Sequence, residues 1–190
     1  MAAAKSLTPA ELQRVLTYID TQPLAARNRA MFMMSVAAGL RVSEIAGLTL
    51  GDVMDGRGGV RTEVYLAADR VKHGHARTIY INTRLQQELA EYLAAKPHRD
   101  ATFPLFNSSR GPRCFFSANT LSQHFFWLYR RAGVAGASSH SGRKTFLTSL
   151  ATQGVSVFVM AALAGHRSIS TTQKYVTVND EVKRRAVELV

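Results

Sequence analysis

The chain has 190 residues, of which 46% are hydrophobic and 19% charged, so it is long and apolar enough to bury a domain-sized core. It carries 24 Lys and Arg against 13 Asp and Glu, and a net charge of +11 favours a nucleic-acid partner over a membrane surface. Cys114 is the only cysteine, which excludes an intramolecular disulfide and a cysteine-based zinc site. No apolar run is long enough to cross a membrane and the N-terminus lacks the apolar core of a secretory signal, so we expect a cytoplasmic protein.

The N-terminal third is predicted to be helical. Thr8, Pro9 and Glu11 match a capping box, which starts a helix of about a dozen residues. The segment 24–40 has apolar residues on nearly every side, which is typical of a buried helix, and Gly39 is its expected stop. A short helix, VSEIAGL, is expected directly after residue 41.

The pattern changes between residues 60 and 82. VRTEVYLAA and RTIYIN are rich in β-branched and aromatic residues and flank the polar DRVKHGHA, which predicts a hairpin or small antiparallel sheet. Thr83 and Gln86 match a second capping box, for a helix through about residue 95. Residues 96–113 contain Pro, Gly and Ser and are expected to form a loop.

The last third is predicted to be helical again. The expected helices span 119–132, 140–153 and 156–164, with the stops Gly133, Gly154 and Gly165, followed by a final helix DEVKRRAVELV. The fold class is therefore α+β: a mostly helical single domain over residues 1–190 with one small antiparallel sheet.

Several residues could carry chemistry, although each alone is also explained as an ordinary surface residue. Arg41 lies between a helix stop and a short helix, and His140 and Arg143 are spaced to share a helix face. Lys72 lies in the hairpin turn, where an ammonium could protonate a leaving oxygen. Tyr175 is a possible covalent nucleophile that needs cationic neighbours to react at neutral pH.

Other kinds of site find little support. His73 and His75 have no carboxylate or cysteine nearby to complete a metal-ligand set. There is no phosphate-binding Gly-rich loop, no nucleophile elbow and no paired-carboxylate motif, and a two-metal nuclease needs more acidic residues.

Four motifs in order, AAGLRVSEIAGL, VKHGHARTIYI, HSGRKTF and LAGHRSISTTQKYV, resemble the tyrosine recombinase family of the lambda-integrase type. The resemblance covers roughly residues 8–178 and implies the catalytic domain of that family. It implies the catalytic set Arg41, Lys72, His140, Arg143, His166 and Tyr175, and Glu44 as the acidic residue that supports the first arginine. It implies no metal and no cofactor.

The chain departs from the family pattern around the second arginine. Gly142 replaces the usual leucine, Lys144 replaces a histidine, and Ala164 stands where leucine is common. The length also departs, since the family's N-terminal, core-binding domain has no counterpart here. The chain is therefore either an excised catalytic domain or a natural short recombinase.

The implied reaction cleaves and rejoins DNA through a 3′-phosphotyrosine. The two arginines bind the phosphate oxygens, His140 assists proton transfer or holds the pentacoordinate phosphate, and Lys72 protonates the leaving 5′-oxygen. The implied partner is double-stranded DNA, bound by a homo-tetramer on paired sites or by a monomer in isolation, in a bacterial, plasmid or phage context. Val182, Ala186 and Leu189 of the final helix either dock on a neighbouring subunit or pack on their own core.

Two alternatives remain beside a site-specific recombinase. A type IB topoisomerase or telomere resolvase shares the chemistry without exchanging two sites. A DNA-binding module without catalysis would bind with a steep salt dependence and leave no covalent product. The target sequence and the outcome, whether integration, excision, inversion or resolution, do not follow from the chain.

Overall fold

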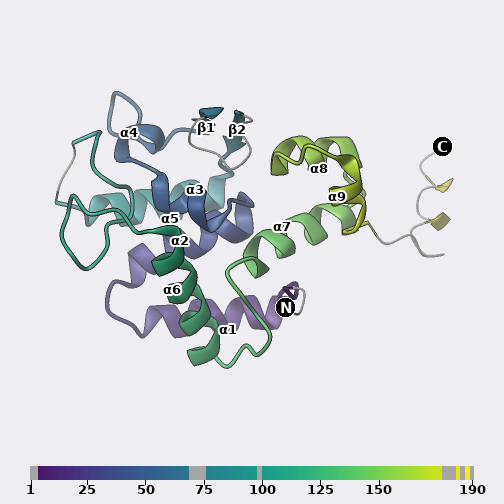
Figure 1. Cartoon of the computed structure of the whole chain (residues 1–190), viewed down its shortest axis with the longest axis horizontal. Coiled ribbons are helices and arrows are strands. Elements are labelled where there is room, and N and C mark those ends of the chain that lie inside the picture. Colours follow the sequence, from purple (N-terminus) through teal and green to yellow (C-terminus); the bar gives the residue numbers. More distant parts are fainter. Residues whose placement is uncertain (1–3, 69–75, 98–99, 177–182, 185–186, 189–190) are drawn as a thin grey trace.

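The computed structural model describes residues 4–68, 76–97, 100–176, 183–184 and 187–188. These residues are mostly helical and include one small antiparallel sheet, which confirms the predicted fold class (Figure 1). The helices are α1 (Pro9–Asp20), α2 (Ala25–Ala37), α3 (Val42–Gly47), α4 (Leu50–Val53), α5 (Thr83–Ala94), α6 (Ala118–Arg131), α7 (Ser141–Thr152), α8 (Val157–Ala164) and α9 (Ile169–Gln173), and the strands are β1 (Glu63–Leu66) and β2 (Arg77–Tyr80). None of the described helices combines the length and apolarity that crossing a membrane requires.

The elements fall into a larger and a smaller group joined by α7. Figure 1 shows α1 to α6 and the strands on one side, and α8 and α9 together at the far end of α7. The main hydrophobic cluster fills the larger group, and a second cluster of Leu147, Met160 and Ala164 joins α7 to α8. β2 also contacts α8, so the strands bridge the two groups.

α2 is the centre of the larger group because its sequence leaves it no polar face. It contacts α1, α3, α5 and α7, and its residues 30–35 are all buried. Gly39 follows it with φ +65°, and an added Cβ there would collide with the ring of Phe146. The predicted buried helix and its stop are both confirmed, and this close approach brings α7 onto α2.

Local sequence signals account for most helix ends. The first capping box is confirmed, since the Glu11 amide donates to Thr8 Oγ1 and the Thr8 amide to Glu11 Oε2. The second is wrong: Asn82 caps α5 by accepting from the Leu85 amide at 2.9 Å. Gln86 instead donates to the Ile81 carbonyl. Asparagine caps as well as threonine does, so the helix begins with Thr83 as its first residue.

The sheet explains how a charged residue reaches the interior. β1 and β2 pair antiparallel with Leu66 opposite Arg77, and burial alternates along both strands. Arg77 and Ile79 therefore point toward the core, while Thr78 and Tyr80 are more exposed. The predicted hairpin is confirmed in its strands; Lys72, His73 and His75 lie outside the described residues, as do Val182, Ala186 and Leu189 of the predicted last helix.

His124 is a buried imidazole in α6. Its ring packs near Phe116 and Phe125, and its Nε2 is buried without a hydrogen-bond partner. Burial, and then the charges of Arg27 and Arg131, lower the pKa of His124 from 6.5 to about 4. Between pH 4 and 6.5 this ring is therefore neutral in the folded chain and protonated in the unfolded chain.

We expect the free energy of unfolding to fall when the pH is lowered from 6.5 toward 4, because the unfolded state then binds the extra proton. His124 should account for on the order of 2 kcal/mol of this loss. His124→Phe keeps a ring in place and should flatten the slope in that window. Urea unfolding of both proteins across the pH range measures it, and equal slopes would contradict the assignment.

Candidate active site

Two arginines from distant parts of the chain meet on one buried carboxylate, Glu44. Arg77, the first residue of β2, binds it with a two-bond fork, Nη1 to Oε1 at 2.6 Å and Nη2 to Oε2 at 2.7 Å. Arg41, the N-cap of α3, donates its amide to Oε2 at 2.7 Å and Nη1 to Oε1 at 3.0 Å. Glu44 thus ties the start of α3 to the strand that follows the hairpin turn.

Arg143, the third arginine, is held by backbone carbonyls. Its Nη1 donates to Gly39 O at 2.7 Å and its Nη2 to Ala164 O at 2.5 Å. The next carbonyl, Gly165 O, accepts Nη2 of Arg41 at 3.4 Å, so Arg41 and Arg143 converge on consecutive residues at the end of α8. A guanidinium has five N–H groups, so these bonds leave each of the two arginines donors for a ligand.

The cluster carries an excess of positive charge. Burial alone raises the pKa of Glu44, but the hydrogen bonds and charge of Arg77, with those of Arg41, outweigh it and lower the pKa, so the carboxylate is ionised. Burial and the nearby Arg41 lower the pKa of Arg143 to about 9. Three guanidinium groups with only one carboxylate among them make a partly desolvated, net positive region that suits an anion.

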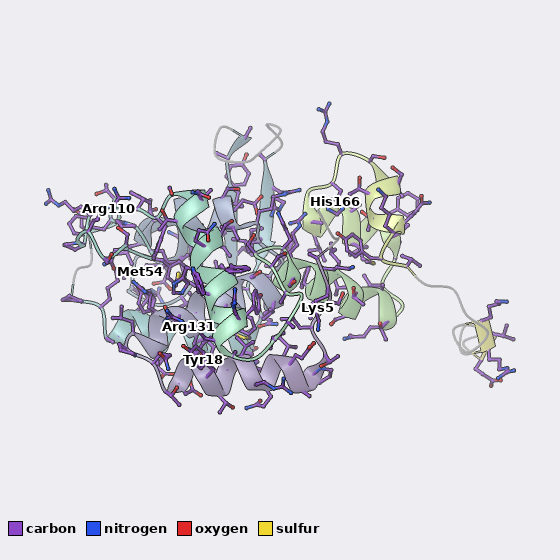
Figure 2. All side chains as sticks on the ribbon, turned by 60° about the horizontal axis from the view of Figure 1, so that its bottom comes forward. Lys5, Tyr18, Met54, Arg110, Arg131 and His166 are labelled. Atoms are coloured by element: carbon purple, nitrogen blue, oxygen red, sulfur yellow. The ribbon has the colours of Figure 1, made fainter. Side chains whose placement is uncertain are left out.

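His166 lies in the turn after α8, beside these arginines; Figure 2 labels it. Its Nδ1 lies 2.8 Å from Oγ1 of the fully buried Thr172, and burial, then Arg143, Arg41 and Arg77, lower the pKa of His166 to about 4. The imidazole is therefore neutral at physiological pH. The turn needs a glycine at 165, where φ is +62° and an added Cβ would lie 2.8 Å from Arg77 Cδ.

Tyr175 follows α9 and faces the same cluster. Its ring is nearly parallel to that of His166, with centroids 6.4 Å apart, and it packs on the small cluster that joins α7 to α8. It is half-buried, and it lies close enough to Arg143 to favour the charged form of that arginine. The ring of Tyr175 therefore lies beside His166 and near the desolvated guanidinium of Arg143.

The structure thus brings together Arg41, Arg143, His166 and Tyr175 of the six residues that the sequence pattern proposed. His140 is the N-cap of α7 and is exposed, with no side-chain hydrogen bond to the other site residues that the structure describes. Lys72 lies outside the described residues. Among the described residues, no group of three or more His, Cys, Asp or Glu side chains could hold a metal ion.

Arg77 is the site residue that the sequence pattern left without a role. The alternation of side chains along β2 could have identified it. Arg77 shares the inward face with Ile79 and Ile81, and a charged residue on that face needs a buried partner. The sequence did not predict that Glu44 and Arg77 pair, because they are 33 positions apart. Only the folded chain brings their side chains into contact.

The unusual Gly142 also has a structural reason. A Cβ at this position would collide with Ser35 of α2, so α7 packs on α2 without a side chain between them. A leucine has no room there. The glycine therefore places Arg143 against the end of α2, where it meets the Gly39 carbonyl.

We expect Arg77→Met to lower the free energy of unfolding by about 3–5 kcal/mol, because it leaves Glu44 buried without its main partner. Adding Glu44→Gln should recover part of this loss, a coupling of roughly 1 kcal/mol or more. Arg61→Met, at an exposed arginine, is the matched control and should change stability little. Urea unfolding of Arg77→Met, Glu44→Gln, their double variant and Arg61→Met decides, and strictly additive losses in the double variant would refute the pairing.

Known proteins with similar sequences are recombinases. Residues 5–182 match the phage integrase family. The chain is 30% identical to tyrosine recombinase XerC of Pelobacter propionicus, over 90% of this chain and 59% of the relative, and 33% identical to XerD of Vibrio cholerae, over 93% and 58%. It is 29% identical to XerA of Pyrococcus furiosus, over 97% and 61%. The chain thus spans about three fifths of the length of these relatives.

Solved structures share the fold. The crystal structure of XerA recombinase matches with a TM-score of 0.76 at 23% identity, covering 100% of this chain and 66% of that one. The Tn1549 transposon integrase in complex with a circular intermediate DNA matches with a TM-score of 0.79 at 20% identity, covering 100% and 67%. With the family match over nearly its whole length, the chain belongs to the phage integrase family.

Proposed function

We propose that the chain is a site-specific DNA recombinase that cleaves and rejoins strands through a 3′-phosphotyrosine. The observation that supports this best is that Arg41 and Arg77 share the carboxylate of Glu44, while Arg143 converges with Arg41 on the end of α8 and has Tyr175 as a neighbour. Such a cluster suits a phosphodiester, whose charge grows in the transition state of phosphoryl transfer. The named relatives are tyrosine recombinases, which supports the same activity.

In this proposal Arg41 and Arg143 bind the non-bridging oxygens of one phosphodiester with their remaining N–H groups. The oxygen of Tyr175 attacks phosphorus, a P–O(Tyr) bond forms, and the P–O5′ bond breaks. The phenolic proton leaves with help from His140, and Lys72 gives a proton to the departing 5′-oxygen. A 5′-hydroxyl then attacks the phosphotyrosine and reverses the exchange, so that the number of phosphoester bonds is conserved and no nucleotide is hydrolysed.

His166 acts in this scheme as a neutral hydrogen-bond donor. If the Thr172 hydroxyl donates to Nδ1, the ring proton stays on Nε2, which can reach a phosphate oxygen. Burial, and then the charges of Arg143, Arg41 and Arg77, lower the pKa of His166 to about 4, which favours this neutral form. Arg77 touches no substrate; it keeps Glu44, and through it Arg41, in place.

The assembly and the setting are also part of the proposal. We place the reaction on double-stranded DNA in the cytoplasm, with four copies of the chain on two paired sites and residues 1–190 acting as one catalytic domain. Similar solved structures support the DNA partner, since the Tn1549 integrase is in complex with circular intermediate DNA and a lambda integrase dimer is bound to a core site.

We expect the wild-type chain to form a covalent adduct with a nicked suicide substrate that carries its recombination site, seen as a slow band on a denaturing gel. Tyr175→Phe should abolish the adduct, because only the phenolic oxygen can bond to phosphorus. Tyr65→Phe, at an exposed tyrosine of β1, should leave it intact. An adduct that survives Tyr175→Phe would falsify the assignment.

An intact supercoiled plasmid that carries two copies of the site, used beside the suicide substrate, separates the alternatives. Relaxation of supercoiled DNA without exchange between two sites would indicate a topoisomerase-like strand transferase. Salt-dependent binding with no adduct from the wild type would indicate a binding module.

A further inference from the structure

A cationic cavity of about 400 Å³, separate from the candidate active site, lies between the start of α2, the end of α5 and the loop 107–112. Its lining includes Leu24, Arg27, Lys96, Asn107 and Ser109, and no carboxylate. None of the arginines of the candidate active site lines it. Figure 2 shows Arg110 of the same loop well apart from His166, with α6 between them.

Arg27 and Lys96 meet on one residue of the loop, Asn107. Nη1 of Arg27 donates to the Asn107 carbonyl at 3.1 Å, and Nζ of Lys96 donates to its Oδ1 at 3.2 Å. Arg27 also binds Asn28 Oδ1 through Nε and Nη2, and its guanidinium lies 5.5 Å from the ring centre of Phe116. Both cations are therefore held in place before any ligand arrives.

These two cations have only neutral partners. Lys96 is 8% exposed and donates to Tyr92 Oη and the Leu105 carbonyl as well as to Asn107, and none of these acceptors carries a charge. No carboxylate of the described part of the chain pairs with Arg27 or Lys96. Arg29, two residues along the same helix, is by contrast bound by Asp20 and Glu88.

The pKa values of both Arg27 and Lys96 are lowered, as expected for buried cations without an anionic partner. Burial lowers the pKa of Arg27, and burial followed by the charge of Arg27 lowers the pKa of Lys96. Buried charges in proteins are ordinarily paired, because an unpaired one loses its hydration without compensation. An anion in the cavity would supply that compensation to both.

The free donors suit a tetrahedral oxyanion. Three of the five N–H groups of Arg27 are used by Asn28 and Asn107, which leaves one N–H on each Nη to donate to phosphate oxygens. Nζ of Lys96 has all its donors engaged, so it contributes charge. Ser109, exposed in the loop, can add its hydroxyl.

We propose that this cavity is a phosphate subsite, in which the Arg27 guanidinium binds a backbone phosphate of DNA remote from the one that Tyr175 attacks. The DNA source of that phosphate rests on the proposed function, whereas the chemistry of the cavity does not. A free phosphate ion offers the same oxygens and is the other source. The subsite would anchor the duplex without reading its sequence.

The first arm of the test measures binding of a random-sequence duplex over a range of salt concentrations. Arg27→Gln should reduce the slope of log K against log salt by about one. The advantage of the wild type over the variant should therefore shrink about 3.5-fold for each fourfold rise in salt. Arg14→Gln, which removes the same charge from an exposed site on α1, should leave the slope unchanged.

The second arm uses the wild type alone, so it stands even if Arg27→Gln folds poorly. Inorganic phosphate is titrated into the wild type while the NMR signals of the Arg27 and Lys96 side chains are followed. Unfolding curves check the two variants of the first arm. A reduced slope identifies DNA as the source. Saturable shifts with an unchanged slope identify the free ion. The proposal is overturned if Arg27→Gln and Arg14→Gln have the same salt slope and phosphate does not shift the Arg27 and Lys96 signals.

These outcomes are separate from the proposed function. A chain that forms the Tyr175 adduct but shows neither response keeps its function and loses the subsite. A chain that shows the slope change but forms no adduct keeps the subsite and loses the proposed chemistry.

Discussion

The pairing of Glu44 with two arginines is the interaction on which the site depends. A carboxylate with no exposed surface would be unstable alone, and Arg77 and Arg41 together make it stable by supplying four hydrogen bonds to its two oxygens. The same bonds fix the start of α3 against the strand that leaves the hairpin. The carboxylate neutralises only part of the arginine charge, so the cluster stays cationic while its geometry is held.

Backbone carbonyls do for Arg143 what Glu44 does for Arg41. The carbonyls of Gly39 and Ala164 orient the guanidinium without cancelling its charge, because they are dipoles and not ions. Glycines make this possible: Gly39 turns the chain at the end of α2, and Gly142 lets α7 approach closely enough for Arg143 to reach it. The cavity around Arg27 uses the same device, since Asn28 and Asn107 hold that guanidinium with neutral oxygens. In both places a partly buried guanidinium is oriented by neutral oxygens, and its positive charge is not neutralised by them.

Features that depend on residues close together in the sequence were predicted better than features that depend on residues far apart. Capping at Thr8, the buried helix 24–40 and the glycine stops are short-range features, and they were readable from neighbouring residues. The capping box at Thr83 was wrong because an equally good cap, Asn82, lies one residue earlier. The short helices α4 and α9 were not predicted, because so few residues show no apolar period.

The sequence by itself determined the class of fold, the family and most of the candidate residues, because these depend on motif order, helix signals and total charge. It named Arg41, Arg143, His166 and Tyr175, and the folded chain places them together. Only the tertiary structure decided that Arg77 belongs with Glu44, that His166 is neutral, and that Arg27 and Lys96 share a cavity. Ion pairing, burial and pKa depend on distances across the core, and residues far apart in the chain acquire those distances only when the helices pack.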